Sequence, residues 1–360
     1  MTIESYLKRI RVHPSTEPLI LGDLPSEFIG KLSDEMGNVE ILDQSGLQRN
    51  EFSELQHVED SPNVSRKIPT TSWIYFPWKK SFVRILSEDA YRRVRTSRNK
   101  FLISEDEAKK LSVATVAVAG LNVGGAGAFC LALEGIATSM KLADFDPLSL
   151  SNLNRFQSNL FNLGINKAAL IARSIFEVDP YYKIEVYGDG IDVSNADAFL
   201  SDPSVDLLIE EVDDLKIKIL LREMARDRGI PVLMVTGNSD GIIVDVERFD
   251  VDPELSLLSG HLNDDILTRI KETDLTGLSK KEYALLCRDF IGKEHLAPRL
   301  NMAFEQIGDS IGGIPQLAEA TFLRGAALAF FSRQIITNAD LVSGRYKFGF
   351  DPNNLFSYEH

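Results

Sequence analysis

Cysteine is scarce in this chain of 360 residues, which contains only Cys130 and Cys287. Two thiols are too few for a four-sulfur zinc site and do not stand at ligand spacing, so we expect no zinc. The chain starts with MTIESYLKRIRV, which is charged and has no apolar segment typical of a secretion signal. Together with the low cysteine count, this start predicts a cytoplasmic protein.

Long apolar runs and an excess of basic residues are also missing. Without a run of about 20 apolar residues, no membrane-spanning helix is predicted. Acidic residues outnumber basic ones by 53 to 39, for a formal net charge of −14, whereas nucleic-acid partners usually require a basic face. We therefore expect neither a membrane nor a nucleic-acid partner. The five histidines show no metal-ligand spacing and no nucleophile elbow accompanies them, so they are assigned no role.

The most informative segment runs from residue 115 to residue 157, TVAVAGLNVGGAGAFCLALEGIATSMKLADFDPLSLSNLNRFQ. Its first five residues are apolar, as is typical of a buried parallel strand. Gly120, Gly124 and Gly125 then predict a turn where the backbone approaches a ligand and a helix begins with its N–H groups toward a phosphate. Asn122 replaces the middle glycine of the usual six-residue pattern. Alone, this turn is as typical of a tight strand–helix connection as of a dinucleotide site.

The residues after the next strand indicate nucleotide chemistry. The strand Met140–Ala143 ends at Asp144, about 20 residues past the glycines, where an acidic residue binds ribose hydroxyls. Arg155 follows in SNLNR, and Lys167 in LGINKA. A guanidinium can brace phosphate oxygens as charge shifts during nucleotidyl transfer, and hydride transfer has no evident need for it. Arg155 and Lys167 therefore favour a triphosphate over a nicotinamide cofactor.

The segments DFDPLSLSNLNR and LGINKA resemble the ThiF/MoeB family, over roughly residues 90 to 250. The resemblance implies an ATP- and Mg²⁺-dependent adenylyltransferase that joins AMP to a carboxylate, usually the C-terminus of a small β-grasp carrier protein. It also implies a homodimer. The residues that it implies for nucleotide binding are Gly120, Asn122, Gly124, Gly125, Asp144, Asp146, Asn152, Arg155 and Lys167.

The resemblance further implies a metal ligand and an arginine that acts on the partner subunit's ATP. The family's Asp-x-Thr-Asp-Asn motif matches residues 210–214, EEVDD, where Asp213 corresponds to the Mg²⁺ ligand. Glu210, Val212 and Asp214 replace the other motif residues. By itself this segment is an acidic strand end. Arg98, in RTSRN, corresponds to the arginine of the family's N-terminal segment, although Arg95 lies close by.

Cysteine marks the clearest departure from the family. Many members carry two Cys-x-x-Cys pairs for zinc, which are absent here, so the chain is a divergent member. Cys287 lies far beyond the position where the family places its reactive thiol, and the neighbouring Arg288 is expected to lower its pKa. The sequence favours adenylation over a later thiol-transfer step.

Along the chain we predict three regions: a small N-terminal α+β region at 1–85, an adenylation core at 86–250, and an insert with C-terminal helices at 251–360. The fold class is α/β, with a Rossmann-like, mainly parallel sheet, helices on both faces and an antiparallel edge strand at 242–249. The aromatic cluster at 73–78 is expected to pack a small domain onto a larger one, with binding of a partner as the alternative. The polar insert at 251–300 shows little periodicity and is interpreted either as a lid over the substrate or as a surface excursion.

Three functions remain open from the sequence. The first is ATP-dependent adenylation of a carboxylate on a β-grasp protein, a peptide or a metabolite. The second is an NAD(P)-dependent oxidoreductase, supported only by the glycine turn and Asp144. The third is a non-catalytic scaffold, which the departures at Asn122, Val212 and Asp214 keep open.

Overall fold

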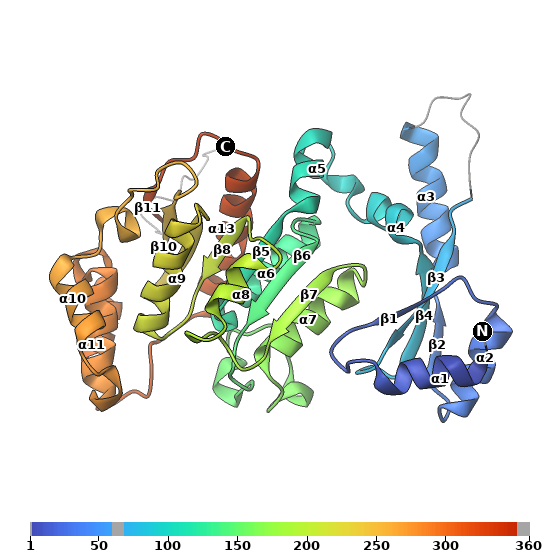
Figure 1. Ribbon diagram of the computed structural model, residues 1–360, viewed down its shortest axis with the longest axis horizontal. Helices are drawn as coiled ribbons and strands as arrows, with labels where there is room; N and C mark the ends of the chain where they lie inside the picture. The colour runs from blue at the N-terminus through green and yellow to red at the C-terminus, as the bar shows by residue number, and fades with distance from the viewer. Residues whose placement is uncertain (1, 60–67, 351–360) are drawn as a thin grey trace, which may run out of the picture. The chain divides into compact units, whose positions relative to one another are not determined.

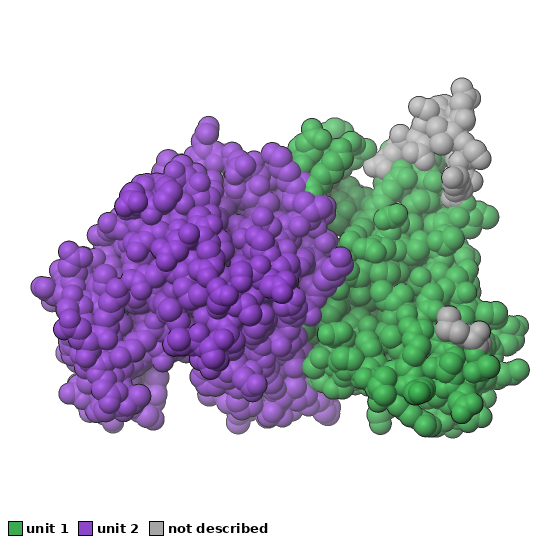
Figure 2. All heavy atoms as spheres, in the orientation of Figure 1, with its two compact units in different colours: residues 1–109, 132–135, 172–182 green, residues 110–131, 136–171, 183–360 purple. Residues whose placement is uncertain are grey.

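The computed structural model describes residues 2–59 and 68–350. The chain forms two compact units, shown in different colours in Figure 2. Unit 1 comprises residues 1–109, 132–135 and 172–182, and unit 2 comprises residues 110–131, 136–171 and 183–360.

Unit 1 is built around a four-stranded sheet in the order β1-β3-β4-β2. Strands β3 and β4 form an antiparallel hairpin, β1 is antiparallel to β3, and β2 is parallel to β4. The predicted small N-terminal α+β region is therefore confirmed. Its elements are α1 (Ile3–Val12), β1 (Leu19–Gly22), α2 (Ser26–Glu35), β2 (Glu40–Asp43), α3 (Ser45–Glu59), β3 (Thr71–Phe76), β4 (Ser81–Leu86) and α4 (Glu88–Arg95).

The aromatic cluster contributes to the hydrophobic packing inside unit 1. Successive residues of a strand point to opposite faces of the sheet. Trp73 and Tyr75 accordingly belong to one hydrophobic cluster, while Ile74 and Phe76 belong to another with Tyr181.

Unit 2 contains a seven-stranded sheet in the order β11-β10-β9-β8-β5-β6-β7 (Figure 1). Neighbours among β9, β8, β5, β6 and β7 are parallel, whereas β10 is antiparallel to both β9 and β11. This confirms the mainly parallel sheet with an antiparallel edge. The strands are β5 (Thr115–Ala119), β6 (Ser139–Ala143), β7 (Lys183–Tyr187), β8 (Leu207–Glu210), β9 (Val232–Asn238), β10 (Gly241–Glu247) and β11 (Gly344–Gly349).

One strand lies elsewhere than predicted. The segment 242–249 was expected at the edge, but β10 is covered on its outer side by β11, which pairs with it from Gly241 to Val246. All residues of β10 are buried. The edge is formed by a strand that lies about 100 residues further along the chain, which local periodicity does not reveal.

Helices cover both faces of the sheet of unit 2. On one face, α6 packs against α7 and α13, with Gly125 facing Ile171 and Gly127 facing Leu328. On the other face, α8 and α9 share a buried apolar cluster with α10 and α11. The helices are α5 (Glu105–Val113), α6 (Leu121–Glu134), α7 (Lys167–Val178), α8 (Ala196–Ser201), α9 (Leu215–Asp227), α10 (Asp264–Glu272), α11 (Lys280–Ile291), α12 (Pro298–Gln306) and α13 (Ala318–Ile336).

The insert at 251–300 is more regular than expected, since α10, α11 and the start of α12 fall within it. Ser279 and Glu282 form a capping box at the start of α11. Within the described part of the chain, no helix has the length and apolar character needed to cross a bilayer.

Candidate nucleotide site

A cavity lies where the carboxyl ends of four parallel strands meet. The chain runs from β5 outward to β6 and β7, then returns to β8 on the other side of β5, so the strand order reverses between β5 and β8. Ligands of open α/β sheets bind at such a switch point. The cavity has a volume of about 190 Å³. Its lining includes the following residues: Gly120, Asn122, Asp144, Phe145, Asp146, Lys167, Gly190, Ile191, Glu211, Val212, Asp213, Asp214 and Ile217.

The glycines at the start of α6 divide into two groups. Gly120 lines the cavity with a φ of +87°, and a Cβ there would collide with the backbone carbonyl of Glu211. Gly124 and Gly125, however, lie inside α6, which begins at Leu121, and a Cβ at Gly124 would stand 2.6 Å from Val118 Cγ1. The structure therefore places these two glycines at helix–strand and helix–helix contacts instead of at the helix start.

Asp144 holds the start of α6. Its Oδ2 accepts the N–H of Leu121 at 2.8 Å, and its Oδ1 accepts the N–H of Asp146 at 2.9 Å. Burial raises the pKa of the carboxyl, while these bonds and Lys167 act in the opposite direction. One of the helix N–H groups expected to face a phosphate is thus bound by Asp144. The nearby Asn122 side chain lines the cavity, and its buried Oδ1 has no hydrogen-bond partner within the described residues.

Lys167 is fixed at the cavity by the acidic segment opposite it. It is the first residue of α7, is nearly fully buried, and its Nζ lies 2.9 Å from Asp146 Oδ2. Asn166 Nδ2 donates to the backbone oxygen of Asp144 at 2.8 Å. The two sequence segments that suggested the family are therefore joined in space, and they place an ammonium beside two carboxylates.

Arg155 is half-buried in the loop after β6. Its Nη1 donates to Ser151 O at 3.1 Å and to Asn154 Oδ1 at 2.8 Å, while its buried Nε has no partner within the described residues. Burial lowers the pKa of Arg155, and the negative charge of Asp213 acts to raise it. The guanidinium is therefore close enough to Asp213 for their charges to interact.

Asn152 has a local role in the same loop. It is buried, and its Oδ1 accepts the N–H of Ser149 at 3.1 Å and the Ser149 hydroxyl at 3.0 Å. We interpret Asn152 as the residue that shapes the turn before Arg155 and not as a direct nucleotide contact.

All residues of the acidic motif except Glu210 line the cavity. Asp213 does so, and burial raises its pKa although Lys218 and Lys167 oppose that shift. Glu210 points away from the cavity, into a buried ion network with Lys218, at 3.0 Å, and Arg222. These two cations lower the pKa of Glu210 against the effect of burial. The Oδ1 of Asp214 caps α9 by accepting two N–H groups of its first turn.

The carboxylates that remain suit Mg²⁺. The described residues contain no group of three or more potential metal ligands. Mg²⁺ nevertheless usually takes only one or two carboxylates and completes its shell with water and substrate phosphates. Asp213 and Asp146 both line the cavity, and the negative charge of Asp146 helps to raise the pKa of Asp213. The donor set therefore fits a nucleotide-bound Mg²⁺.

The two arginines considered for the partner's ATP differ in environment. Arg98 is exposed in a short 3-10 helix, Ser97–Asn99, of unit 1. Arg95 is bound within unit 1, where it donates to Ala132 O at 2.8 Å and to Asp179 Oδ2 at 3.1 Å. Arg98 is thus the better placed of the two to contact another molecule.

The expected effect of Arg288 on Cys287 is wrong. Arg288 pairs with Asp289 at 3.1 Å and with Glu305 at 2.9 Å. Burial raises the pKa of the Cys287 thiol to about 12, and Asp213 adds to the shift. A thiol that stays protonated is a poor nucleophile.

Sequence reasoning missed two charged residues beside the site, the partly buried Glu211 and the buried Arg324. Glu211 was read only as the variable position of the acidic motif. Arg324 is the sole charged residue within TFLRGAALAFF of α13, and it is 2% exposed. A single arginine in such an apolar helical stretch was a signal that could have been used.

Residues 96–250 match the model of the ThiF family. The uncharacterized protein MT1398 of Mycobacterium tuberculosis is 38% identical over 275 residues, which are 76% of this chain and 37% of that protein. tRNA threonylcarbamoyladenosine dehydratase 2 of Saccharomyces cerevisiae is 27% identical over 156 residues, 42% of this chain and 34% of that protein. The chain thus spans little more than a third of the length of these relatives.

Among solved structures, Escherichia coli tRNA N6-threonylcarbamoyladenosine dehydratase, TcdA, in complex with AMP, shares the fold with a TM-score of 0.51 at 19% identity. The match covers 71% of this chain and 98% of that one. The matched residues contain the two segments that carried the resemblance, which is confirmed: residues 96–250 of the chain belong to the ThiF family.

Proposed function

We propose that the chain binds ATP at the carboxyl ends of β5, β6, β7 and β8 and transfers AMP to a carboxylate, releasing pyrophosphate. The observation that carries this proposal is the convergence of Lys167, Asp213, Asp144 and Asn122 on one cavity at the switch point of the sheet.

The lining of the cavity matches the parts of a nucleotide. Phe145, Ile191, Val212 and Ile217 supply apolar surface for a base. Asp144 supplies carboxylate oxygens for ribose hydroxyls, as acidic residues do at the end of a second strand. Cationic residues then stand where a polyphosphate would extend, with Lys167 in the cavity and Arg155 near Asp213.

In this proposal the protein acts mainly by alignment and charge neutralisation. A carboxylate oxygen of the substrate attacks the α-phosphorus, and the bond from that phosphorus to the oxygen bridging to the β-phosphate breaks. The electron pair leaves with pyrophosphate, and the substrate becomes an acyl adenylate. Lys167 and Arg155 stabilise the charge on the phosphates. Asp213, with Asp146, would hold Mg²⁺, which neutralises phosphate charge when bound. No protein nucleophile is required.

The alternatives are less well supported. The match of residues 96–250 to the ThiF family and the phosphate cations leave no argument for an oxidoreductase beyond the glycine turn and Asp144. A non-catalytic scaffold differs from the proposal only in lacking turnover. A β-grasp carrier protein or a peptide is retained as the source of the carboxylate.

Arg98 is proposed to act on the ATP of the partner subunit in a homodimer. Equal ATP turnover by Arg98→Ala and wild type would argue against that role.

ATP–pyrophosphate exchange tests the proposal. Purified protein would be given Mg²⁺, ATP, labelled pyrophosphate and a panel of carboxylic acids and peptides. Label should enter ATP with the wild type and fall by at least about a hundredfold in Lys167→Ala and Asp213→Asn, as expected from losing charge stabilisation of about 3 kcal/mol. Lys183→Ala, an exposed lysine on β7, is the matched control. Formation of ADP and phosphate in place of exchange would contradict the proposal.

A further inference from the structure

A second cavity, of about 130 Å³, adjoins the nucleotide cavity in unit 2. The two share Glu211, Val212 and Asp213, the residues that follow β8. A ligand in the second cavity can therefore reach a nucleotide in the first without leaving the protein. The sequence gives no hint of this cavity, because its walls come from β9 and from α11, α12 and α13, which are distant along the chain.

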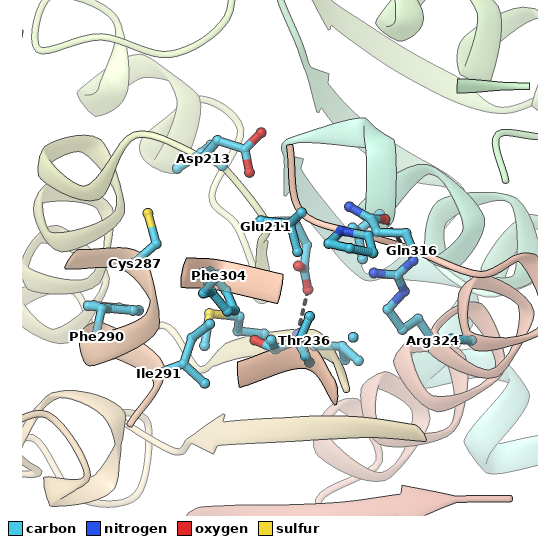
Figure 3. Close-up of a pocket in the computed structure, with 18 of the residues that line it drawn as sticks. Glu211, Asp213, Thr236, Cys287, Phe290, Ile291, Phe304, Gln316 and Arg324 are labelled. Atoms are coloured by element: carbon cyan, nitrogen blue, oxygen red, sulfur yellow. Dashed lines mark hydrogen bonds between the residues drawn. The ribbon is translucent and has the colours of Figure 1, made fainter. Parts of the chain in front are cut away.

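The second cavity has one apolar side and one polar corner (Figure 3). The apolar side is formed by α11 and α12, and the polar corner by α13 and the segments that follow β8 and precede α13. The insert at 251–300 and the start of α12 thus supply a wall of the cavity. The apolar lining residues include Phe290, Ile291, Leu300 and Phe304, and the polar ones include Glu211, Asp213, Lys218, Thr236, Gln316 and Arg324.

Arg324 is the informative residue of the polar corner. Its guanidinium is buried, and Nη2 donates to Gln316 Oε1 at 3.1 Å and to Thr321 Oγ1 at 2.5 Å. Its Nε has no hydrogen-bond partner within the described residues, and among these residues no carboxylate lies within ion-pair distance. A buried charge without a counter-ion is costly, which indicates that a ligand supplies the anion.

The charges around the corner support an anionic ligand. Burial lowers the pKa of Arg324 to about 10, so the guanidinium remains charged at neutral pH. Glu211 acts on the pKa of Arg324 in the opposite direction, but its carboxylate is not within ion-pair distance, and its Oε1 accepts the N–H of Val235 instead. Arg155 also contributes to lowering the pKa of Arg324, which indicates that the corner lies near the proposed phosphate cation.

We propose that this cavity binds the acyl substrate and selects a carboxylate that is attached to a compact apolar group, with Arg324 binding the carboxylate. The inference rests on the proposed function. One carboxylate oxygen is held by Arg324, and the other faces the nucleotide. An apolar cavity of about 150 Å³ can hold a benzene molecule, so a cavity of about 130 Å³ that opens into the nucleotide cavity limits the apolar group to at most about that size. A Gly-Gly terminus would leave this side unfilled.

A carboxylate attached to an apolar group can come from two sources, a free apolar acid or a peptide that ends in an apolar residue. Calorimetry without nucleotide, using benzoate, acetate, benzyl alcohol, Gly-Gly and Gly-Phe, separates the contributions of the carboxylate and of the apolar group. Benzoate or Gly-Phe should bind at least about tenfold more tightly than the three probes that lack one feature. The tighter of the two identifies the source. Equal binding of acetate or of benzyl alcohol overturns the proposal.

Two variants place the ligand in the cavity. Arg324→Gln should weaken the preferred acid at least about tenfold, and Arg324→Lys should restore part of the affinity, because a charge-assisted bond is lost and then regained. Leu317→Trp fills the cavity from a half-exposed position that tolerates substitution, and should also weaken binding. Leu133→Trp, exposed on α6, is its control. Unchanged binding in both Arg324→Gln and Leu317→Trp overturns the proposal.

The binding and exchange experiments together distinguish failure of the proposed adenylation from failure of this pocket. Acid binding that depends on Arg324 without ATP–pyrophosphate exchange retains this pocket and refutes adenylation. Exchange with Gly-Gly-terminated peptides, together with no binding of benzoate or Gly-Phe, retains adenylation and refutes this pocket.

Discussion

Glu211 is predicted to make the protein less stable as the pH rises. Its carboxyl group lines both cavities, and its Oε1 accepts the N–H of Val235 at 2.5 Å. Burial raises its pKa from 4.5 to about 8, although Lys218 and the Val235 bond oppose the shift. Between these two values the folded protein holds one proton more than the unfolded chain. The free energy of unfolding must therefore fall across this pH window.

The size of the effect follows from the shift. Each pKa unit corresponds to about 1.4 kcal/mol, so the full shift amounts to roughly 5 kcal/mol. This figure is an upper bound, because Glu211 borders cavities that admit water, and we expect a loss of about 2 to 5 kcal/mol between pH 5 and pH 9. Glu211→Gln keeps the oxygen that accepts from Val235 and removes the titration. The variant should therefore be more stable than the wild type above about pH 8, and the two should converge below about pH 5.

Urea unfolding at several pH values measures this difference. Far-ultraviolet circular dichroism is the suitable probe, because Trp73 and Trp78 both lie in unit 1 and their fluorescence reports on that unit. Glu185→Gln, at an exposed position of β7, is the control and should follow the wild type. A difference between wild type and Glu211→Gln that stays constant across the pH range would refute the reasoning.

Three further predictions concern packing and reactivity. Arg222→Met leaves two buried carboxylates without their shared cation and should destabilise the protein by about 3 to 5 kcal/mol in urea unfolding; a loss below about 1 kcal/mol would contradict the structure. Gly127→Val should lower the free energy of unfolding by about 1 to 3 kcal/mol, because a Cβ there stands 2.5 Å from Leu328 Cδ1. Unchanged stability in the same assay would show that α6 and α13 are not in close contact. Cys287 should resist alkylation by iodoacetamide at pH 8, as its pKa is about 12, and mass spectrometry finding it modified as fast as free cysteine would count against its burial.

The sequence predicted those site residues whose positions follow from the neighbouring strand or helix along the chain. Asp144 and Lys167 were found because each directly follows a strand or starts a helix, so their positions in the sheet follow from their positions in the sequence. Arg324 and Glu211 were missed because their meaning depends on a cavity whose walls come from segments about 100 residues apart.

The glycines and acidic residues show the other limit of the sequence. Gly124 and Gly125 look the same as phosphate-loop glycines, yet they accommodate Val118 and Ile171. Glu210 likewise belongs to the acidic motif, but it faces Arg222 inside the protein. In both cases the residue type was informative, and only the three-dimensional neighbours show which of two uses applies.

Calorimetry of ATP with Mg²⁺, beside NAD and NADP, tests the central claim most directly. The account predicts Mg²⁺-dependent ATP binding that is weakened at least about tenfold in Lys167→Ala and Asp213→Asn and unchanged in Lys183→Ala, with no tight binding of NAD or NADP. Tight NAD or NADP binding with no response to ATP would contradict it, as would ATP binding that is indifferent to both substitutions in the cavity.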